Sequence, residues 1–180
     1  MTSLSLRPYE QYEITGARPS SDLYALSDRL VARDIVAIVQ IEGPIHADLL
    51  YYRMAKLYSI ERAGGEVRRV VDRALREATR AGDVVRRGRF YWPKGLEEVA
   101  PRLAGPRAVE QIAPEEMSAT LLAVLHAGGP LATAELVRAT SRALGFQRTG
   151  ASLNAGITAA IDALVASGRG RLQDGSVTAR

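Results

Sequence analysis

Cysteine is absent from the 180-residue sequence, lysine occurs only twice, and aromatic residues make up 6% of the chain. The lack of cysteine excludes disulfides, thiolate metal sites and cysteine nucleophiles, and it fits a reducing compartment. No apolar run approaches the roughly 20 residues that a membrane span needs. The first residues also lack the basic start and apolar stretch of a signal peptide. We therefore expect a cytoplasmic protein with mainly aliphatic cores and no membrane association.

Motifs that would indicate an enzyme are also missing. The sequence contains no G-x-x-x-x-G-K-[ST] phosphate loop, no G-x-S-x-G serine elbow and no H-E-x-x-H zinc motif. His46 and His126 belong to no cluster with metal-ligand spacing, so we interpret both as structural. The acidic pairs at 97–98 and 115–116 are adjacent, and adjacent side chains on a helix do not face each other. We predict no catalytic activity, no cofactor and no metal.

A repeat with an offset of 86 residues organises most of the chain. The match needs no gap from residue 28 to 82, and it includes turn residues and apolar core positions together. We interpret the chain as two copies of one helical unit. The matching positions include Gly43-Pro44 with Gly129-Pro130, Leu50 with Leu136, Arg62 with Arg148, Gly64 with Gly150, Gly82 with Gly168, and Val31, Ile35, Ile38 and Val39 with Met117, Leu121, Val124 and Leu125.

Each copy predicts helix, helix, turn, helix and hairpin in that order. In the first copy, apolar periodicity predicts three helices between residues 27 and 81, and a glycine between β-branched and aromatic residues predicts a hairpin over residues 84–92. In the second copy, Asp174-Gly175 is a strong two-residue turn signal. Its glycine is displaced by one position from Gly88, so we expect the hairpins to differ slightly in length. This order of elements is typical of the winged helix, a helix-turn-helix with an added hairpin.

The predicted fold is therefore mainly α with short β-hairpin wings, arranged as tandem winged-helix domains at residues 27–92 and 114–180. Residues 1–26 contain Pro, Gly, Ser and Tyr without clear periodicity, and we expect an extended lead-in that packs on the first domain. Residues 93–113 contain three prolines and two glycines, which predicts a connector with a short helical turn.

Arginine is concentrated in the first copy. Segment 62–94 has ten basic and four acidic residues, a net charge of +6, whereas the whole chain has +4. On the third helix, four arginines follow the spacing i, i+4, i+7 and i+11 opposite the apolar face. Folding does not require such like charges, but phosphates would compensate them and arginine can read guanine edges. The candidate nucleic-acid-binding residues are Arg62, Arg68, Arg69, Arg73, Arg76, Arg80, Arg86, Arg87 and Arg89.

Two further interpretations of this segment follow from its neighbours. Phe90, Tyr91 and Trp92 lie beside the hairpin arginines, so the wing is expected to straddle a backbone or to stack on an exposed base. Alternatively, the arginines are a solvated helix face that pairs with nearby acids such as Asp72, Glu77 and Asp83.

The second copy lacks this charge. The four stripe positions become Ala155, Ala159, Asp162 and Ala166, and segment 115–180 has six arginines against five acids. Bias in the source genome would act on both copies alike and does not explain the difference. The small outer face, which includes Gly156, suits close packing against the first copy, a second chain or another protein, or it is a plain alanine-rich surface.

Several spaced residues carry a resemblance to a known family. Glu42 to His46 read EGPIH and are followed by Arg62 with Gly64; further matches are Gly82, Phe90 with Trp92, Ile112 with 114–116, 144–146, and Arg148 with Gly150. Over about residues 28–170 the chain resembles an uncharacterised domain at the C-terminus of large bacterial superfamily 1 helicases, which often also carry a Vsr-like endonuclease domain. The resemblance implies a module of a DNA-processing machine, including those of antiphage systems, and it implies no catalytic residues.

From the sequence we expect a non-catalytic nucleic-acid-binding module. Its partner is DNA, as duplex or junction, bound by the first winged helix. The alternative is a protein–protein interaction module that docks on a helicase core or forms a homodimer, with the second winged helix as the interacting part.

Overall fold

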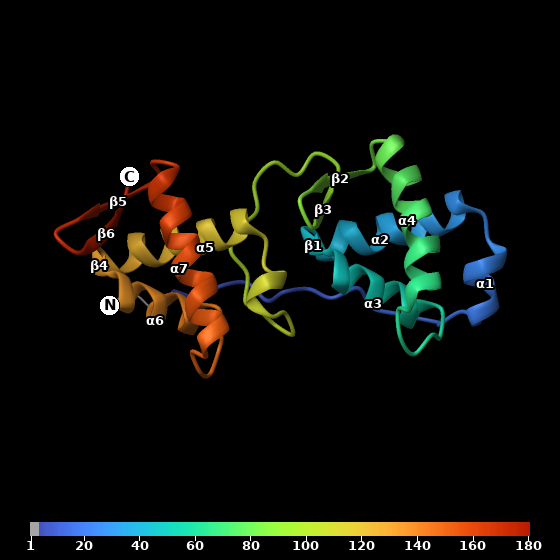
Figure 1. The fold of residues 1–180 in the computed structure, drawn as a ribbon, viewed down its shortest axis with the longest axis horizontal. Helices are drawn as coiled ribbons and strands as arrows, with labels where there is room; N and C mark the ends of the chain where they lie inside the picture. Colours follow the sequence, from blue (N-terminus) through green and yellow to red (C-terminus); the bar gives the residue numbers. More distant parts are fainter. Residues whose placement is uncertain (1–3) are drawn as a thin grey trace. The chain divides into compact units, whose positions relative to one another are not determined.

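The computed structural model describes residues 4–180, which divide into two compact units. The first unit is Glu10–Glu97. The second unit combines the described part of Met1–Tyr9 with Glu98–Arg180. Figure 1 shows the helices and short strands that make up each unit. The protein is mainly helical, with small antiparallel β-hairpin sheets, as the sequence predicts.

The first unit contains four helices and three strands. The helices are α1 (Ser20–Ala25), α2 (Asp28–Glu42), α3 (Ala47–Leu57) and α4 (Gly65–Arg80). The strands are β1 (Ile45–His46), β2 (Val84–Arg87) and β3 (Phe90–Pro93), which form an antiparallel sheet in the order β1-β3-β2. β3 therefore lies between the strand that precedes α3 and the first strand of the hairpin.

The second unit repeats this order. Its elements are the short 3-10 helix η1 (Val109–Gln111), α5 (Pro114–Gly128), β4 (Leu131–Ala132), α6 (Thr133–Ala143), α7 (Ala151–Ala166), β5 (Gly170–Gln173) and β6 (Ser176–Ala179). The sheet order is β4-β6-β5, which matches the order in the first unit.

The 86-residue offset holds at every boundary of the six repeated elements. Adding 86 to the bounds of α2, β1, α3, α4, β2 and β3 gives the bounds of α5, β4, α6, α7, β5 and β6. The two hairpins thus have equal length, and the predicted difference between them is wrong. The turn position that Gly88 occupies with φ 57° is taken by Asp174 with φ 50°. Aspartate tolerates this left-handed conformation better than most residues, so a displaced glycine does not require a longer turn.

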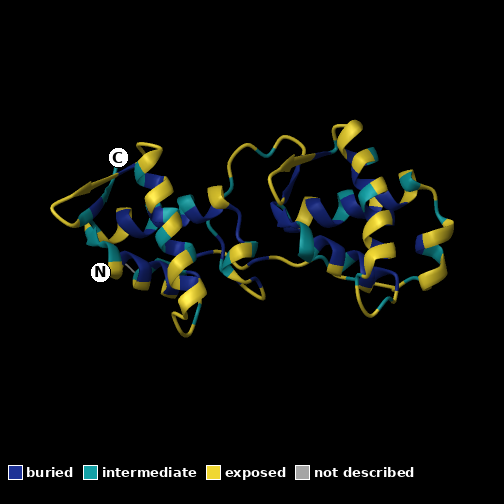
Figure 2. Ribbon diagram, in the orientation of Figure 1, coloured by how far each residue is buried: buried dark blue, intermediate teal, exposed yellow. Residues whose placement is uncertain are grey.

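Each unit has its own aliphatic core, and every long helix is buried along one side (Figure 2). Leu50 on α3 and Leu136 on α6 occupy equivalent positions, and both are fully buried. α4 and α7 are each followed by a glycine with φ 74°, Gly82 and Gly168, where the left-handed conformation ends the helix at low steric cost. The periodic apolar residues therefore explain which side of each helix is buried, and the two glycines explain where α4 and α7 end.

The predicted lead-in, residues 1–26, is not a uniform extended segment. Its described beginning belongs to the second unit, where Leu6 is buried and the Tyr9 ring lies 4.0 Å from the Arg107 guanidinium. Its later part belongs to the first unit and includes α1, and Arg18 binds the Asp34 carboxylate. Leu6 joins an apolar core, whereas the contacts of Tyr9 and Arg18 are aromatic or polar. None of them follows a periodic pattern, so periodicity did not predict them.

The predicted connector, residues 93–113, is also part of the folded units. Pro93 ends β3, and residues from Glu98 onward belong to the second unit. The Leu103 amide donates to the Arg7 carbonyl at 2.8 Å, and η1 provides the predicted short helical turn. Across residues 4–180, no helix is both long enough and apolar enough to cross a membrane.

Candidate nucleic-acid interface

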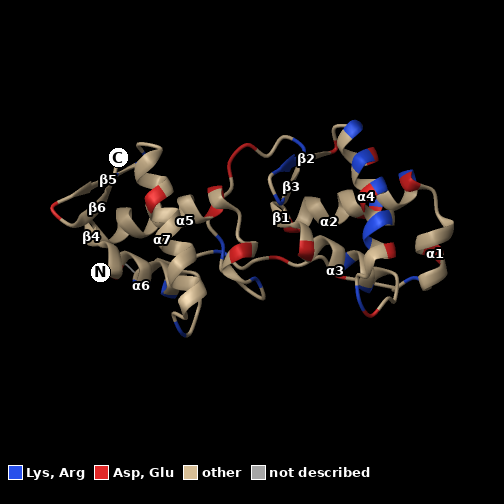
Figure 3. Ribbon diagram, in the orientation of Figure 1, with Lys and Arg blue, Asp and Glu red and all other residues tan. Residues whose placement is uncertain are grey.

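Helix α4 displays the arginines predicted from the sequence. It buries its valines and Leu75 in the first core, and Glu66 in the first turn and Arg80 in the last turn suit the helix macrodipole. All nine candidate residues are exposed, including those in the preceding loop and in the hairpin. Figure 3 shows the basic residues gathered along α4 and on the β2–β3 hairpin.

The predicted arginine stripe of α4 divides into two parts with different surroundings. Arg73 Nε lies 3.2 Å from Asp28 Oδ1 at the start of α2, and Arg69 Nε donates to the Gly65 carbonyl of its own helix. Arg76 and Arg80 instead line a groove. The stripe therefore has two environments: Arg73 contacts the start of α2, whereas Arg76 and Arg80 face the groove.

This basic groove has a volume of about 770 Å³ and lies among the start of α3, the exposed side of α4 and the β2–β3 hairpin. Two carboxylates, of Asp48 and Asp72, also line it. Since five basic side chains face two acidic ones, the groove has an excess of positive charge. The five arginines are Arg68, Arg76, Arg80, Arg86 and Arg89.

Two tyrosines form part of the groove wall without cancelling its charge. Burial, together with the hydrogen bond from Tyr51 Oη to Asp72 Oδ1 at 2.5 Å, raises the pKa of Tyr51. Burial raises the pKa of Tyr91 also, although the positive charge of Arg86 opposes that shift. Both phenols are therefore neutral near pH 7. Among residues 4–180, Arg76 forms no ion pair, so its guanidinium is available to a ligand.

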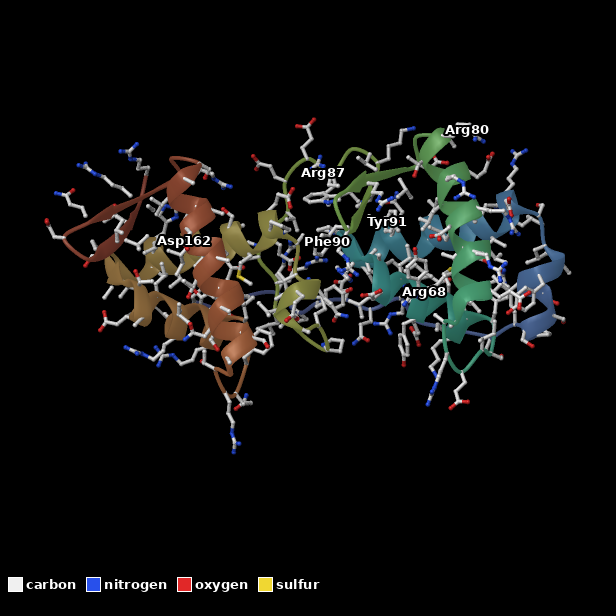
Figure 4. All side chains as sticks on the ribbon, viewed as in Figure 1. Arg68, Arg80, Arg87, Phe90, Tyr91 and Asp162 are labelled. Atoms are coloured by element: carbon white, nitrogen blue, oxygen red, sulfur yellow. The ribbon has the colours of Figure 1, made fainter. Side chains whose placement is uncertain are left out.

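Strand alternation explains why the two arginines of β2 face opposite sides of the hairpin. Arg86 pairs in register with Tyr91 and faces the groove, whereas the next residue, Arg87, lies on the opposite face. The Arg87 guanidinium lies 4.1 Å from the centroid of the Trp92 ring. Figure 4 labels Arg87 and Tyr91 on the hairpin.

The hairpin aromatics do not provide the predicted stacking surface. Phe90, Tyr91 and Trp92 are 8%, 5% and 0% exposed, so none presents a ring face on which a base could stack. The Phe90 ring packs edge-on against His46 of β1, 5.2 Å between centroids. β3 is the central strand of its sheet, and this position accounts for burial that the sequence pattern alone does not reveal.

Asp48 is a residue of this site that the sequence interpretation missed. Its Oδ1 lies 3.3 Å from Arg68 Nη1, and its Oδ2 lies 3.2 Å from Arg89 Nη2. One carboxylate thus bridges α4 and the hairpin. Sequence spacing gave no signal for this pairing, because 20 and 41 residues separate Asp48 from its two partners.

The acids expected to neutralise the arginines do so only in part. Arg80 pairs with Glu77 at 3.0 Å, but its side chain is highly exposed, and such surface pairs contribute little. Asp72 accepts a hydrogen bond from Tyr51 rather than an ion pair from an arginine. Local pairing therefore leaves much of the groove's charge uncompensated.

The equivalent positions of the second unit contain no arginine. Adding 86 to the five groove arginines gives Asn154, Asp162, Ala166, Leu172 and Gly175. Figure 3 shows α7 without basic residues, and Figure 4 labels Asp162 on that helix. The two units thus share their order of elements but differ in the chemistry of this surface.

The small-residue face of α7 is partly covered by its own chain. A Cβ at Gly156 would lie 2.9 Å from Val109 Cγ2 of η1, which explains the need for glycine there. Ala155, Ala159 and Ala166 are exposed. Part of the predicted packing surface is therefore already occupied by the segment before α5.

The two histidines and the acidic pair at 115–116 lie in different surroundings. His46 is buried at the N-cap of α3, and its Nδ1 accepts a hydrogen bond from the Asp48 amide at 3.2 Å. His126 is exposed in the last turn of α5. Glu116 is buried and pairs with Arg102 and Arg107. Searched over residues 4–180, the His, Asp and Glu side chains form no group that could hold a metal ion.

Comparison with known proteins gives one match. Residues 21–69 match the model of a family described as "protein of unknown function (DUF3320)". The match includes most of α1, all of α2, β1 and α3, and the first turn of α4, so the first unit is similar to that family through the start of its arginine-bearing helix. No curated protein and no solved structure matches the chain.

Proposed function

We propose that each unit is a winged helix. The support is the order α2-β1-α3-α4-β2-β3 and its repetition as α5-β4-α6-α7-β5-β6, with the last strand between the other two in both sheets. In this assignment α3 and α4 are the helix-turn-helix, α4 is the helix that enters a nucleic-acid groove, and the β2–β3 hairpin is the wing.

We further propose that the first unit binds DNA, as duplex or junction, through the basic groove. The observation that supports this most strongly is the contrast between the units: five arginines line the groove, and none occupies the five equivalent positions of α7 and its hairpin. Both units fold with the same elements, so folding does not require this charge. A phosphate backbone supplies the compensating negative charge, and Arg62 and Arg69 extend the contact surface beyond the groove, whereas Arg73 pairs with Asp28 and Arg87 lies on the opposite face of the hairpin.

The geometry suits a helix in the major groove with the wing against the adjacent backbone. Arg76 and Arg80 project from the exposed side of α4, where guanidinium groups can reach phosphates or guanine edges. Arg86 and Arg89 project from the wing toward the same groove. The buried aromatics exclude base stacking by the wing, which favours duplex over single-stranded DNA.

The proposed biological context is a non-catalytic module of a helicase- or nuclease-type DNA-processing system, including antiphage systems, in the cytoplasm. It is supported by the resemblance over residues 28–170 and by the family match over residues 21–69, although that family is itself described only as uncharacterised.

A second candidate is protein interaction through the second unit. It is favoured by the uncharged, exposed alanines of α7, which differ from the basic face of α4. Light scattering on the isolated chain tests the homodimer form of this candidate: a monomeric mass at micromolar concentration would exclude it.

A salt titration tests DNA binding. Labelled duplex and single-stranded DNA are titrated with the protein at several salt concentrations, and the double variant Arg76→Gln/Arg80→Gln is compared with the wild type. We expect the wild type to prefer duplex and to lose affinity steeply as salt rises. Each phosphate contact contributes about 0.9 to the slope of log K against log salt, so the double variant should have a slope smaller by about 1.8. Absence of binding to either DNA would overturn the proposal.

A further inference from the structure

Asp48 has an unusual position within the basic groove. Its two carboxylate oxygens face two guanidinium groups from different elements, Arg68 of α4 and Arg89 at the tip of the β2–β3 hairpin. An anion held between two converging arginines is the arrangement with which proteins bind a phosphate group. In this structure an internal carboxylate takes that place.

The backbone fixes the position of these groups. The Ala47 amide, at the start of α3, donates to the Arg89 carbonyl at 2.9 Å and so joins the hairpin tip to the helix. His46 caps the same helix by accepting from the Asp48 amide. Arg68 lies with its guanidinium 4.6 Å from the centroid of the Tyr51 ring, which limits its movement. The backbone of Arg89 and the guanidinium of Arg68 are therefore positioned by contacts other than those with Asp48.

The Asp48 side chain is 41% exposed, so it is accessible to solvent. Exposed ion pairs are weak because water competes for both partners. A phosphodiester group offers two charged oxygens that accept bidentate hydrogen bonds from arginine, and release of counterions from DNA favours the exchange. The ion pairs of Asp48 are thus weak enough for a DNA phosphate to displace the carboxylate from the two arginines.

We infer that Asp48 is an internal phosphate mimic: its carboxylate occupies the site at which Arg68 and Arg89 bind one backbone phosphate of duplex DNA, and it weakens DNA binding until it is displaced. This inference rests on the proposed function of the first unit. In the second unit the acid and both arginines are absent together, as expected if they act as one group. The positions equivalent to Asp48, Arg68 and Arg89 are Ala134, Asn154 and Gly175.

Asp28 provides a matched control within the same unit. It too lies in the first turn of a helix, its side chain is also 41% exposed, and it pairs with one α4 arginine, Arg73. It does not line the basic groove. Asp28→Asn and Asp48→Asn change the net charge equally, so any difference in DNA affinity between them reports position rather than charge.

The experiment measures duplex-DNA affinity of the full chain at low salt for wild type, Asp48→Asn, Asp48→Glu and Asp28→Asn. Two exposed ion pairs no longer have to be broken in Asp48→Asn, so its affinity should rise about three- to tenfold. Asp48→Glu keeps the charge and should stay close to wild type. Asp28→Asn should change affinity by less than about twofold. The gain should disappear when Arg68→Gln and Arg89→Gln are added to Asp48→Asn, because the released arginines are then absent.

The outcomes separate this inference from the proposed function. Wild-type binding with equal effects of Asp48→Asn and Asp28→Asn overturns the phosphate mimic alone. A gain that persists without Arg68 and Arg89 also overturns it. Binding by Asp48→Asn but not by wild type supports it in its strongest form. Absence of DNA binding by all variants overturns both. Circular dichroism checks the fold, and Asp48→Ser provides a second neutral variant if Asp48→Asn does not fold.

Discussion

Replacement of Glu116 by glutamine should destabilise the second unit strongly. Glu116 is fully buried at the start of α5, and its carboxylate accepts four hydrogen bonds. Two come from Arg102, at 3.0 and 2.7 Å, and two come from Arg107, at 2.8 and 2.9 Å. The Arg107 side chain is itself fully buried.

The expected loss of unfolding free energy follows from the two guanidinium groups that Glu116→Gln leaves without a counter-charge. Glutamine is neutral, so two buried or nearly buried guanidinium groups would lose their counter-charge, and the amide nitrogen would face further donors. Removing one partner of a buried ion pair costs about 3–5 kcal/mol. The neighbouring Glu115 is exposed, and Glu115→Gln should cost less than about 0.5 kcal/mol.

The same cluster predicts the direction of a pH effect. Burial opposes the charged form of Glu116, but hydrogen bonds from Arg107 and Arg102 outweigh it and hold the pKa of Glu116 below its ordinary 4.5. A lowered pKa means that this stabilisation is complete above about pH 4.5 and is lost as the pH falls through the folded-state value. The stability difference between wild type and Glu116→Gln should therefore narrow under acidic conditions.

Urea unfolding followed by circular dichroism, at pH 7 and at pH 3, measures both effects. Trp92 is the only tryptophan and lies in the first unit, so its fluorescence follows that unit separately. A loss below about 1 kcal/mol at pH 7, or equal losses for Glu116→Gln and Glu115→Gln, would refute the reasoning.

Two further predictions concern the repeated fold. Leu50→Ala and Leu136→Ala remove equivalent, fully buried side chains, and each should lower the free energy of unfolding by about 2–5 kcal/mol. Trp92 fluorescence measures the loss for Leu50→Ala, and circular dichroism measures it for Leu136→Ala. A loss well under about 1 kcal/mol in either variant would contradict the core assignment. Gly43→Ala should cost about 1–3 kcal/mol in urea unfolding, because its Cβ would overlap the Val39 carbonyl and lie 2.6 Å from Pro93 Cδ. Gly65→Ala, which meets no atom within 4 Å, should be neutral or stabilising, and equal effects of the two would count against this packing.

Local patterns predicted the repeated elements well. Helix periodicity and the Gly-Pro and Asp-Gly turns depend on residues close in sequence, and the 86-residue offset compares one copy directly with the other. The structure confirms the helices and hairpins that these patterns indicate. Each turn fixes its conformation from two or three residues. The sequence could therefore locate α4 and its exposed arginines.

Predictions that required tertiary contacts were less successful. The burial of Trp92 depends on the central position of β3 in its sheet. Within residues 4–180, Arg73 forms an ion pair and Arg76 does not, because the first residue of α2, Asp28, lies beside Arg73 alone. Asp48 could not be found from spacing, because its partners come from two elements distant in sequence. The helix Ser20–Ala25 and contacts such as that of Tyr9 with Arg107 follow no period, so the sequence indicated only an extended segment over residues 1–26.

The central claim is that the first unit, and not the second, binds DNA through its exposed arginines. The most direct measurement compares duplex-DNA binding against salt for two double variants, Arg76→Gln/Arg80→Gln in the first unit and Arg138→Gln/Arg142→Gln on α6 in the second. All four arginines are exposed, and the two variants lose the same charge. We predict that the slope of log K against log salt falls by about 1.8 in the first variant and is unchanged in the second. Equal reductions in both, or no reduction in the first, would contradict the account.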